Sequence, residues 1–168
     1  MSPPESYTGD WITPDHPRYS EAIARWAANA ERRAKVVAFV KSAQDVATVL
    51  KYAKQHNYQI AIRGGGHSSS GASSVEDGIV IDLSRHLSGV RVDPVEKLAY
   101  VGGGAIWETV DKAAIEHGLA TVGGTVNHVS PSTLFHFRLA HPPCARLVSG
   151  GVCLIVLFLT RRYSQHLY

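Results

Sequence analysis

The segment IRGGGHSSSG, residues 62–71, decides how this sequence is read, because three glycines abruptly end an apolar pattern. The alternating residues of YQIAI (58–62) precede it and predict a strand. Glycine tolerates positive φ and lets another group approach the backbone closely. Successive free N–H groups can also converge on an anion. The segment therefore predicts either a flexible connection between strands or a cradle for a diphosphate, in which Ser68 is a further donor.

Common phosphate-binding and nucleophile motifs do not fit this segment. A P-loop requires Gly-Lys-Ser/Thr, which the sequence lacks. The dinucleotide-binding fingerprint requires a glycine where Ser69 stands, and a helix where the sequence continues as a loop. The nucleophile elbow of hydrolases requires a glycine where Ser70 stands. The glycine segment alone therefore matches none of these phosphate-binding or catalytic motifs.

The residues before the glycines predict a βαβ unit. KVVAFVK (35–41) is β-branched and apolar, as a buried strand should be. Ser42 with Asp45 resembles a capping box at the start of a helix. Asn57, which tolerates the left-handed conformation, marks the end of that helix before the strand at 58–62. The two strands are expected to be parallel. A further helix is expected upstream, from Tyr19 to Arg33.

The residues after the glycines predict a different pattern. GIVIDLS (78–84) is a strand, and residues 88–104 form a β-hairpin that turns at Asp93-Pro94. A helix follows over residues 105–117, with Gly118 as its stop. Glycines 102–104 open this helix, so they serve either as an anion site at its N-terminus or as a plain hairpin exit. The segment LATVGGTVNHV (119–129) is apolar and interrupted by glycine.

The order of these elements resembles one enzyme family. A βαβ unit, RGGGHS, DGIVIDLS, VRVDPVEKLAYVGGG, a helix and VGGTV follow one another as in the FAD-binding domain of flavin-linked oxidases related to vanillyl-alcohol oxidase. The branch most similar to it contains berberine bridge enzyme and the oligosaccharide oxidases. The resemblance runs from about Lys35 to Val129. It implies an α+β fold of the PCMH type, with a small βαβ subdomain followed by a partly antiparallel sheet with helices.

The resemblance also implies a cofactor and its contacts. In the family, the histidine of this motif is bonded covalently to the 8α-methyl group of the flavin, and His67 takes that place here. Neutral imidazole is a good nucleophile, which suits this role. Some relatives carry a second link through a cysteine, but no cysteine lies between Val122 and Val129. We therefore expect FAD, linked only through His67. The implied cofactor-binding residues are Arg63, Gly64, Gly65, Gly66, His67, Ser68, Gly123, Gly124 and Thr125; no metal ligand and no catalytic residue is predicted.

Composition limits the alternatives. The chain has 168 residues, 45% of them hydrophobic, and a net charge of +3, which suits a globular domain and does not predict a nucleic-acid partner. The start shows no secretory signal, so we expect an intracellular protein. The apolar run from Leu147 to Leu159 is too short for a membrane span, and predicts a buried strand or a tail unrelated to the fold. Cys144 and Cys153 are expected to be free thiols.

Three segments are expected along the chain. Residues 1–34 form an N-terminal arm and helix, and residues 35–129 form the FAD-binding domain. Residues 130–168 lack the glycine-rich continuation of the family and are expected to be a tail from a truncated or mis-spliced gene. The function implied by the resemblance is oxidation of an alcohol, sugar or alkaloid-like small molecule, with O2 as acceptor. The alternatives are an FAD-binding module without turnover and an inactive fragment.

Overall fold

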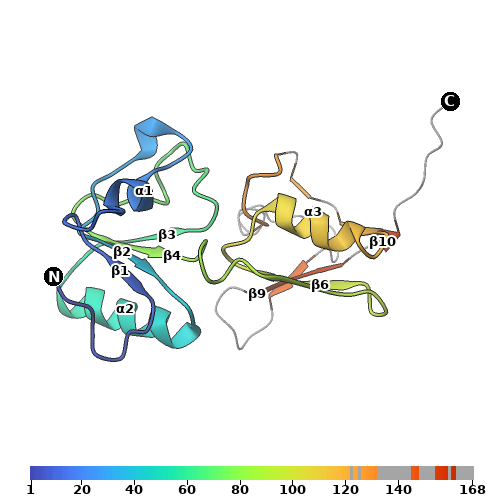
Figure 1. The fold of residues 1–168 in the computed structure, drawn as a ribbon, viewed down its shortest axis with the longest axis horizontal. Coiled ribbons are helices and arrows are strands. Elements are labelled where there is room, and N and C mark those ends of the chain that lie inside the picture. Colours follow the sequence, from blue (N-terminus) through green and yellow to red (C-terminus); the bar gives the residue numbers. More distant parts are fainter. Residues whose placement is uncertain (122, 125, 132–144, 148–153, 159, 162–168) are drawn as a thin grey trace.

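The computed structural model describes residues 1–121, 123–124, 126–131, 145–147, 154–158 and 160–161 (Figure 1). These residues form two four-stranded sheets and one two-stranded sheet. The first sheet contains β1 (Asp10–Ile12), β2 (Val36–Phe39), β4 (Ile79–Asp82) and β3 (Ile60–Arg63), in that spatial order. Strands β2, β4 and β3 are parallel, and β1 joins β2 in the antiparallel sense. The predicted parallel βαβ unit is confirmed, with one addition: β4 inserts between β2 and β3.

Helix α2 (Ala43–Gln55) covers one face of this sheet and begins where the sequence predicts. The Ser42 hydroxyl oxygen accepts the Asp45 N–H at 3.1 Å, so Ser42 is the N-cap. Val49 and Ala53 of the helix pack on alternate residues of β2 and β4. The helix ends before Asn57, whose φ of 54° confirms the predicted left-handed stop.

Helix α1 (Tyr19–Ile23) covers the other face but is much shorter than the predicted helix from Tyr19 to Arg33. The chain turns extended at Ala24, and only a short 3-10 helix, η1 (Ala28–Ala30), follows. The guanidinium of Arg25 donates to the carbonyls of Ala22, Ile23 and Ala24. In a continuing helix, these carbonyls would accept N–H groups of the next turn. The Arg25 side chain takes the place of those main-chain donors, and the helix ends.

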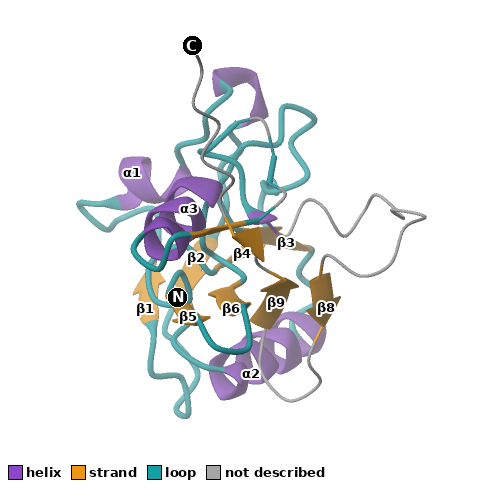
Figure 2. Ribbon diagram, turned by 90° about the vertical axis from the view of Figure 1, so that its right-hand side faces the viewer, coloured by secondary structure: helices purple, strands orange, loops and turns teal. Residues whose placement is uncertain are grey.

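The second sheet is antiparallel and contains β5 (Val90–Asp93), β6 (Leu98–Gly102), β9 (Leu154–Phe158) and β8 (Ala145–Leu147), side by side in Figure 2. The hairpin of β5 and β6 confirms the predicted turn after Asp93. Of the two alternatives for Leu147 to Leu159, the structure has a strand, β9, next to β6.

Helix α3 (Trp107–Ile115) packs on the second sheet, with Trp107, Val110 and Ala114 in a core shared with β6. Gly118 follows with a φ of 66°, as its predicted role as a stop requires. Strand β7 (Leu119–Ala120) then pairs with β10 (Thr160–Arg161). The predicted combination of a βαβ layer and an antiparallel sheet with helices is therefore confirmed.

Candidate functional site

The glycine segment forms a loop that leaves the C-terminal end of β3 and faces the second sheet. Gly66 adopts a φ of 72°, in the left-handed region. The N–H groups of Gly65, Gly66 and His67 donate no hydrogen bond to any residue that the structure describes. Toward the described residues, the segment therefore has three consecutive unused donors, as the cradle hypothesis requires.

The opposite wall is the loop of residues 126–130, which the start of α3 holds in place. The Trp107 N–H donates to the Val129 carbonyl at 3.0 Å, and the Glu108 N–H donates to the Asn127 carbonyl at 2.8 Å. Two N–H groups of the first helical turn are therefore already bonded to protein carbonyls, although these are the donors that a bound anion would use. The structure therefore favours the hairpin-exit interpretation of glycines 102–104.

Two of the three glycines allow these walls to meet. A methyl group added at Gly64 would lie 3.0 Å from the Ser130 hydroxyl oxygen and 3.1 Å from the Gly103 carbonyl oxygen. One added at Gly65 would lie 3.0 Å from the His128 carbonyl oxygen. The sequence predicts that a ligand approaches this backbone; in the structure, the 128–130 segment is what approaches Gly64 and Gly65.

A cavity of about 570 Å³ lies between the walls. This size is in the range of cofactor and ligand pockets. The His67 ring stacks on Trp26 at a centroid distance of 5.3 Å, and on His128 at 6.3 Å, with interplanar angles of 21° and 22°. The lining residues are Trp26, His67, Ser68, Val126, His128 and Val129. The surface is apolar and aromatic except for two imidazoles and one hydroxyl group.

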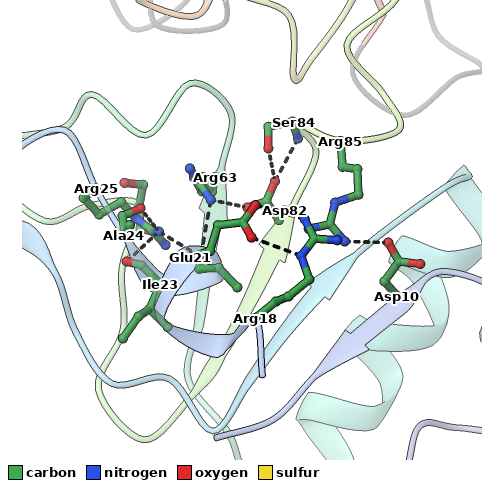
Figure 3. Close-up of polar contacts among 12 residues, drawn as sticks. Asp10, Arg18, Glu21, Ile23, Ala24, Arg25, Arg63, Asp82, Ser84 and Arg85 are labelled. Carbon is green, nitrogen blue, oxygen red and sulfur yellow. Dashed lines mark hydrogen bonds and ion pairs between the residues drawn. The ribbon is translucent and has the colours of Figure 1, made fainter. Parts of the chain in front are cut away.

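Arg63 precedes the glycines but is not among the residues that line this cavity; Figure 3 shows its guanidinium beside Asp82. Its guanidinium forms an ion pair of 2.9 Å with Asp82, whose side chain is fully buried at the end of β4. The other carboxylate oxygen of Asp82 accepts the N–H and hydroxyl of Ser84. Arg63 also lines a second cavity, of about 240 Å³, together with Glu21 and Arg85. Arg63 thus ties β3 to β4 directly below the glycine loop.

Two other ionic groups brace the same end of the first sheet (Figure 3). Arg25 donates to the Ser73 carbonyl at 2.8 and 3.2 Å, and burial lowers the pKa of its guanidinium to about 10, so it remains a cation at neutral pH. Asp10 accepts a hydrogen bond from Arg85 at 2.8 Å, and this bond holds the pKa of the carboxyl below its ordinary value. His86 contacts the same carboxylate of Asp10 at 3.0 Å.

The remaining residues that were predicted to bind the cofactor differ in their surroundings. The Ser68 hydroxyl lies 3.0 Å from that of Ser70 and accepts the Ala72 N–H, while its residue lines the cavity. Methyl groups added at Gly123 and Gly124 would meet the Trp107 ring at 3.1 and 2.9 Å. Thr125 lies outside the described residues, as do Cys144 and Cys153. These assignments to cofactor binding stay predictions.

Sequence reasoning missed four of the six residues that line the cavity, namely Trp26, Val126, His128 and Val129. Trp26 falls within the helix predicted from Tyr19 to Arg33, yet it lies outside any α-helix and 71% of it is exposed beside His67. His128 was part of an apolar segment and received no role. A tryptophan beside an arginine at the end of a short helix is a weak signal, because only the tertiary contacts of Arg25 break that helix.

The cavity fits the dimethylbenzene edge and the diphosphate of FAD on three observations. Its walls are mainly apolar and aromatic, which suits a flat ring. His67 lines it, and neither ring nitrogen forms a hydrogen bond with a described residue. The main-chain N–H groups of Gly65, Gly66 and His67 likewise donate to no described residue. Within the described residues, no group of three or more His, Cys, Asp or Glu side chains suits a metal ion.

Comparisons with known proteins agree with this geometry. Residues 34–133 match the protein family described as FAD binding domain. The (R)-6-hydroxynicotine oxidase of Paenarthrobacter nicotinovorans is 31% identical over 164 residues, covering 98% of this chain and 32% of that protein. The FAD-linked oxidoreductase YgaK of Bacillus subtilis is 34% identical over 122 residues, covering 73% of this chain and 27% of YgaK.

Solved structures show the same fold. The crystal structure of 6-hydroxy-D-nicotine oxidase from Arthrobacter nicotinovorans superimposes with a TM-score of 0.73 at 32% identity, covering 77% of this chain and 28% of that one. A BBE-like protein of Physcomitrella patens has a TM-score of 0.69 at 23% identity, a likeness of fold alone.

These matches define the class of this chain as an FAD binding domain. The chain belongs to the FAD binding domain family of FAD-linked oxidoreductases, as the match over more than half of its length shows. It spans 24% to 32% of the length of three curated relatives that it matches. In the described part of the chain, no helix is both long and apolar enough to cross a membrane.

Proposed function

We propose that this chain is the cofactor-binding part of an FAD-dependent oxidoreductase, and that it bonds FAD covalently through His67. The observation that carries the proposal is the position of His67. Its imidazole lines an apolar cavity, stacks on two aromatic rings, and keeps its nitrogens free of described hydrogen-bond partners.

The residues around the cavity would hold FAD through different kinds of contact. Gly65, Gly66 and His67 present their N–H groups to the diphosphate, and Ser68 adds its hydroxyl at the rim. Val126 and Val129 supply apolar surface for the ring. Arg63 supports these contacts from below through its ion pair with Asp82.

The covalent step balances with O2 as co-reactant. The bond would join one imidazole nitrogen of His67 to the 8α carbon, with loss of the imidazole N–H proton and of one hydrogen of the methyl group. O2 would take up the two protons and two electrons as H2O2. When bound, FAD would supply the acceptor for a hydride from a substrate carbon. The substrate class that we propose is an alcohol, sugar or alkaloid-like small molecule, in line with an amine-containing nicotine derivative as the named substrate of one relative.

A test of the covalent bond uses acid precipitation. The chain is expressed with FAD, precipitated in acid and washed, and the pellet is examined for flavin absorbance. We expect flavin in the pellet for the unmodified chain and for His117→Ala, whose exposed histidine follows α3. We expect none for His67→Ala. Flavin that washes out of all three proteins would contradict the bond, and a chain that takes up no FAD would contradict the proposal as a whole.

Binding of FAD without substrate turnover is the second candidate, because the chain spans only 24% to 32% of three relatives. Peroxide release separates the two. We expect H2O2 above the level of the substrate-free control with at least one compound from a panel of sugars, alcohols and cyclic amines. Loaded protein that releases none with any of them would favour the passive binder.

A further inference from the structure

The ring of His67 is oriented by stacking, since no described residue forms a hydrogen bond with it. Trp26 is the nearer of its two stacked neighbours, at 5.3 Å against 6.3 Å for His128. Offset aromatic pairs at such distances prefer defined mutual orientations. Trp26 therefore limits the directions in which the His67 nitrogens can point.

Trp26 is held in this place although 71% of it is exposed to solvent. The main-chain N–H of Trp26 donates to the Gly66 carbonyl at 3.4 Å, directly before His67 in the sequence. The preceding residue, Arg25, binds the Ser73 carbonyl beyond His67 through two hydrogen bonds. The pair Arg25-Trp26 thus contacts the His67 loop on both sides of the histidine in sequence.

A stabilising role does not account for this exposure. An exposed indole leaves most of its apolar surface in water, so it contributes little to folding through burial. By contrast, Trp107 is 1% exposed and lies in the hydrophobic core between α3 and the second sheet. The contacts of Trp26 are with the cavity and with His67, and both point to a role at the site.

We infer that Trp26 is a positioning residue for His67: its indole fixes the imidazole in the orientation from which the bond to the flavin forms. Arg25 fixes Trp26 in turn, through the hydrogen bonds that end α1 early. This inference rests on the proposed function, since it concerns the same bond with the same balance of atoms. It adds that a residue from the N-terminal segment, outside the glycine motif, sets how fast the bond forms.

The first measurement needs no cofactor. The ring resonances of His67 are recorded by NMR in the FAD-free chain and assigned by their loss in His67→Ala. We expect them to shift downfield in Trp26→Ala, because the ring current of the indole is removed. Trp26→Phe keeps an aromatic ring and should retain most of the upfield displacement. Val95→Ala, which removes an 84% exposed apolar side chain from the far hairpin, should leave them unchanged.

The second measurement follows the covalent bond over time after FAD is added to the FAD-free chain. We expect the rate in Trp26→Ala to fall roughly two- to tenfold, the range that an aromatic pair represents. Trp26→Phe should recover most of the rate. Non-covalent FAD affinity, measured in the His67→Ala background with and without Trp26→Ala, should fall by a smaller factor than the rate of bond formation, because Trp26 lines the cavity but acts on the bond through the histidine.

The outcomes separate this inference from the proposed function. If the unmodified chain binds FAD but forms no bond, the proposed bond fails, and the NMR measurement alone decides whether Trp26 orients His67. If the bond forms equally fast in Trp26→Ala and the resonances of His67 stay in place, the inference is overturned. It is also overturned if Trp26→Ala weakens FAD binding as much as it slows the bond, because Trp26 would then be only a contact of FAD.

Discussion

Gly65→Ala tests whether the two walls of the cavity meet as described. The added methyl group would lie 3.0 Å from the His128 carbonyl oxygen, 3.3 Å from Cγ2 of Ile106 and 3.3 Å from the Ser130 nitrogen. These distances are shorter than ordinary van der Waals contact. Two of the three neighbours are main-chain atoms, so they cannot turn aside as a flexible side chain does.

The loop that carries these atoms resists displacement, which sets the magnitude. Hydrogen bonds of 3.0 and 2.8 Å from the first turn of α3 hold it at Val129 and Asn127. Overpacking of this kind costs about 1–3 kcal/mol. For a chain of this size, we expect the melting temperature to fall by about 2–12 °C. FAD affinity should fall as well, because the displaced loop lines the cavity with His67.

The matched control is Gly89→Ala. A methyl group at Gly89 meets no atom within 4 Å, and Gly89 is not among the residues with positive φ. We expect Gly89→Ala to change stability by less than about 1 kcal/mol, in either direction. Thermal and urea unfolding of both variants are compared with those of the unmodified chain. Equal stability of the two variants would refute the close approach of the 128–130 segment to the glycine loop.

Three further predictions concern the frame of the site. Asp82→Asn leaves the Arg63 guanidinium without its buried carboxylate, so we expect a loss of about 3–5 kcal/mol in urea unfolding; a loss below about 1 kcal/mol would contradict the pairing. Ser42→Ala should cost about 1 kcal/mol by removing the N-cap of α2, whereas Ser42→Asp should restore it. Asp45 is buried; burial raises its pKa, but hydrogen bonds led by the Thr8 N–H outweigh this and hold it below 3.8. The contribution of the ionised Asp45 carboxylate to the free energy of unfolding is therefore complete above pH 3.8 and is lost on acidification below it. In the acid range, the unfolding free energy of Asp45→Asn should therefore vary less with pH than that of the unmodified chain.

The sequence predicted local structure well where neighbouring residues decide it. Ser42 caps α2, and Asn57 and Gly118 adopt the left-handed conformation. These features depend on residues within one helical turn, so their signals are complete in the sequence. The helix expected from Tyr19 to Arg33 was wrong because Arg25 takes the carbonyls at the end of α1.

What the sequence by itself determined is the order of elements and the identity of His67 as the residue of interest. Only the tertiary structure decided what surrounds it. Trp26, His67 and His128 come from three segments far apart in the chain, and no local pattern relates them. The structure also showed that Gly64 and Gly65 admit the 128–130 segment. The physical reason is that side-chain packing between distant segments depends on where the two sheets place them, and a glycine shows only that space is needed.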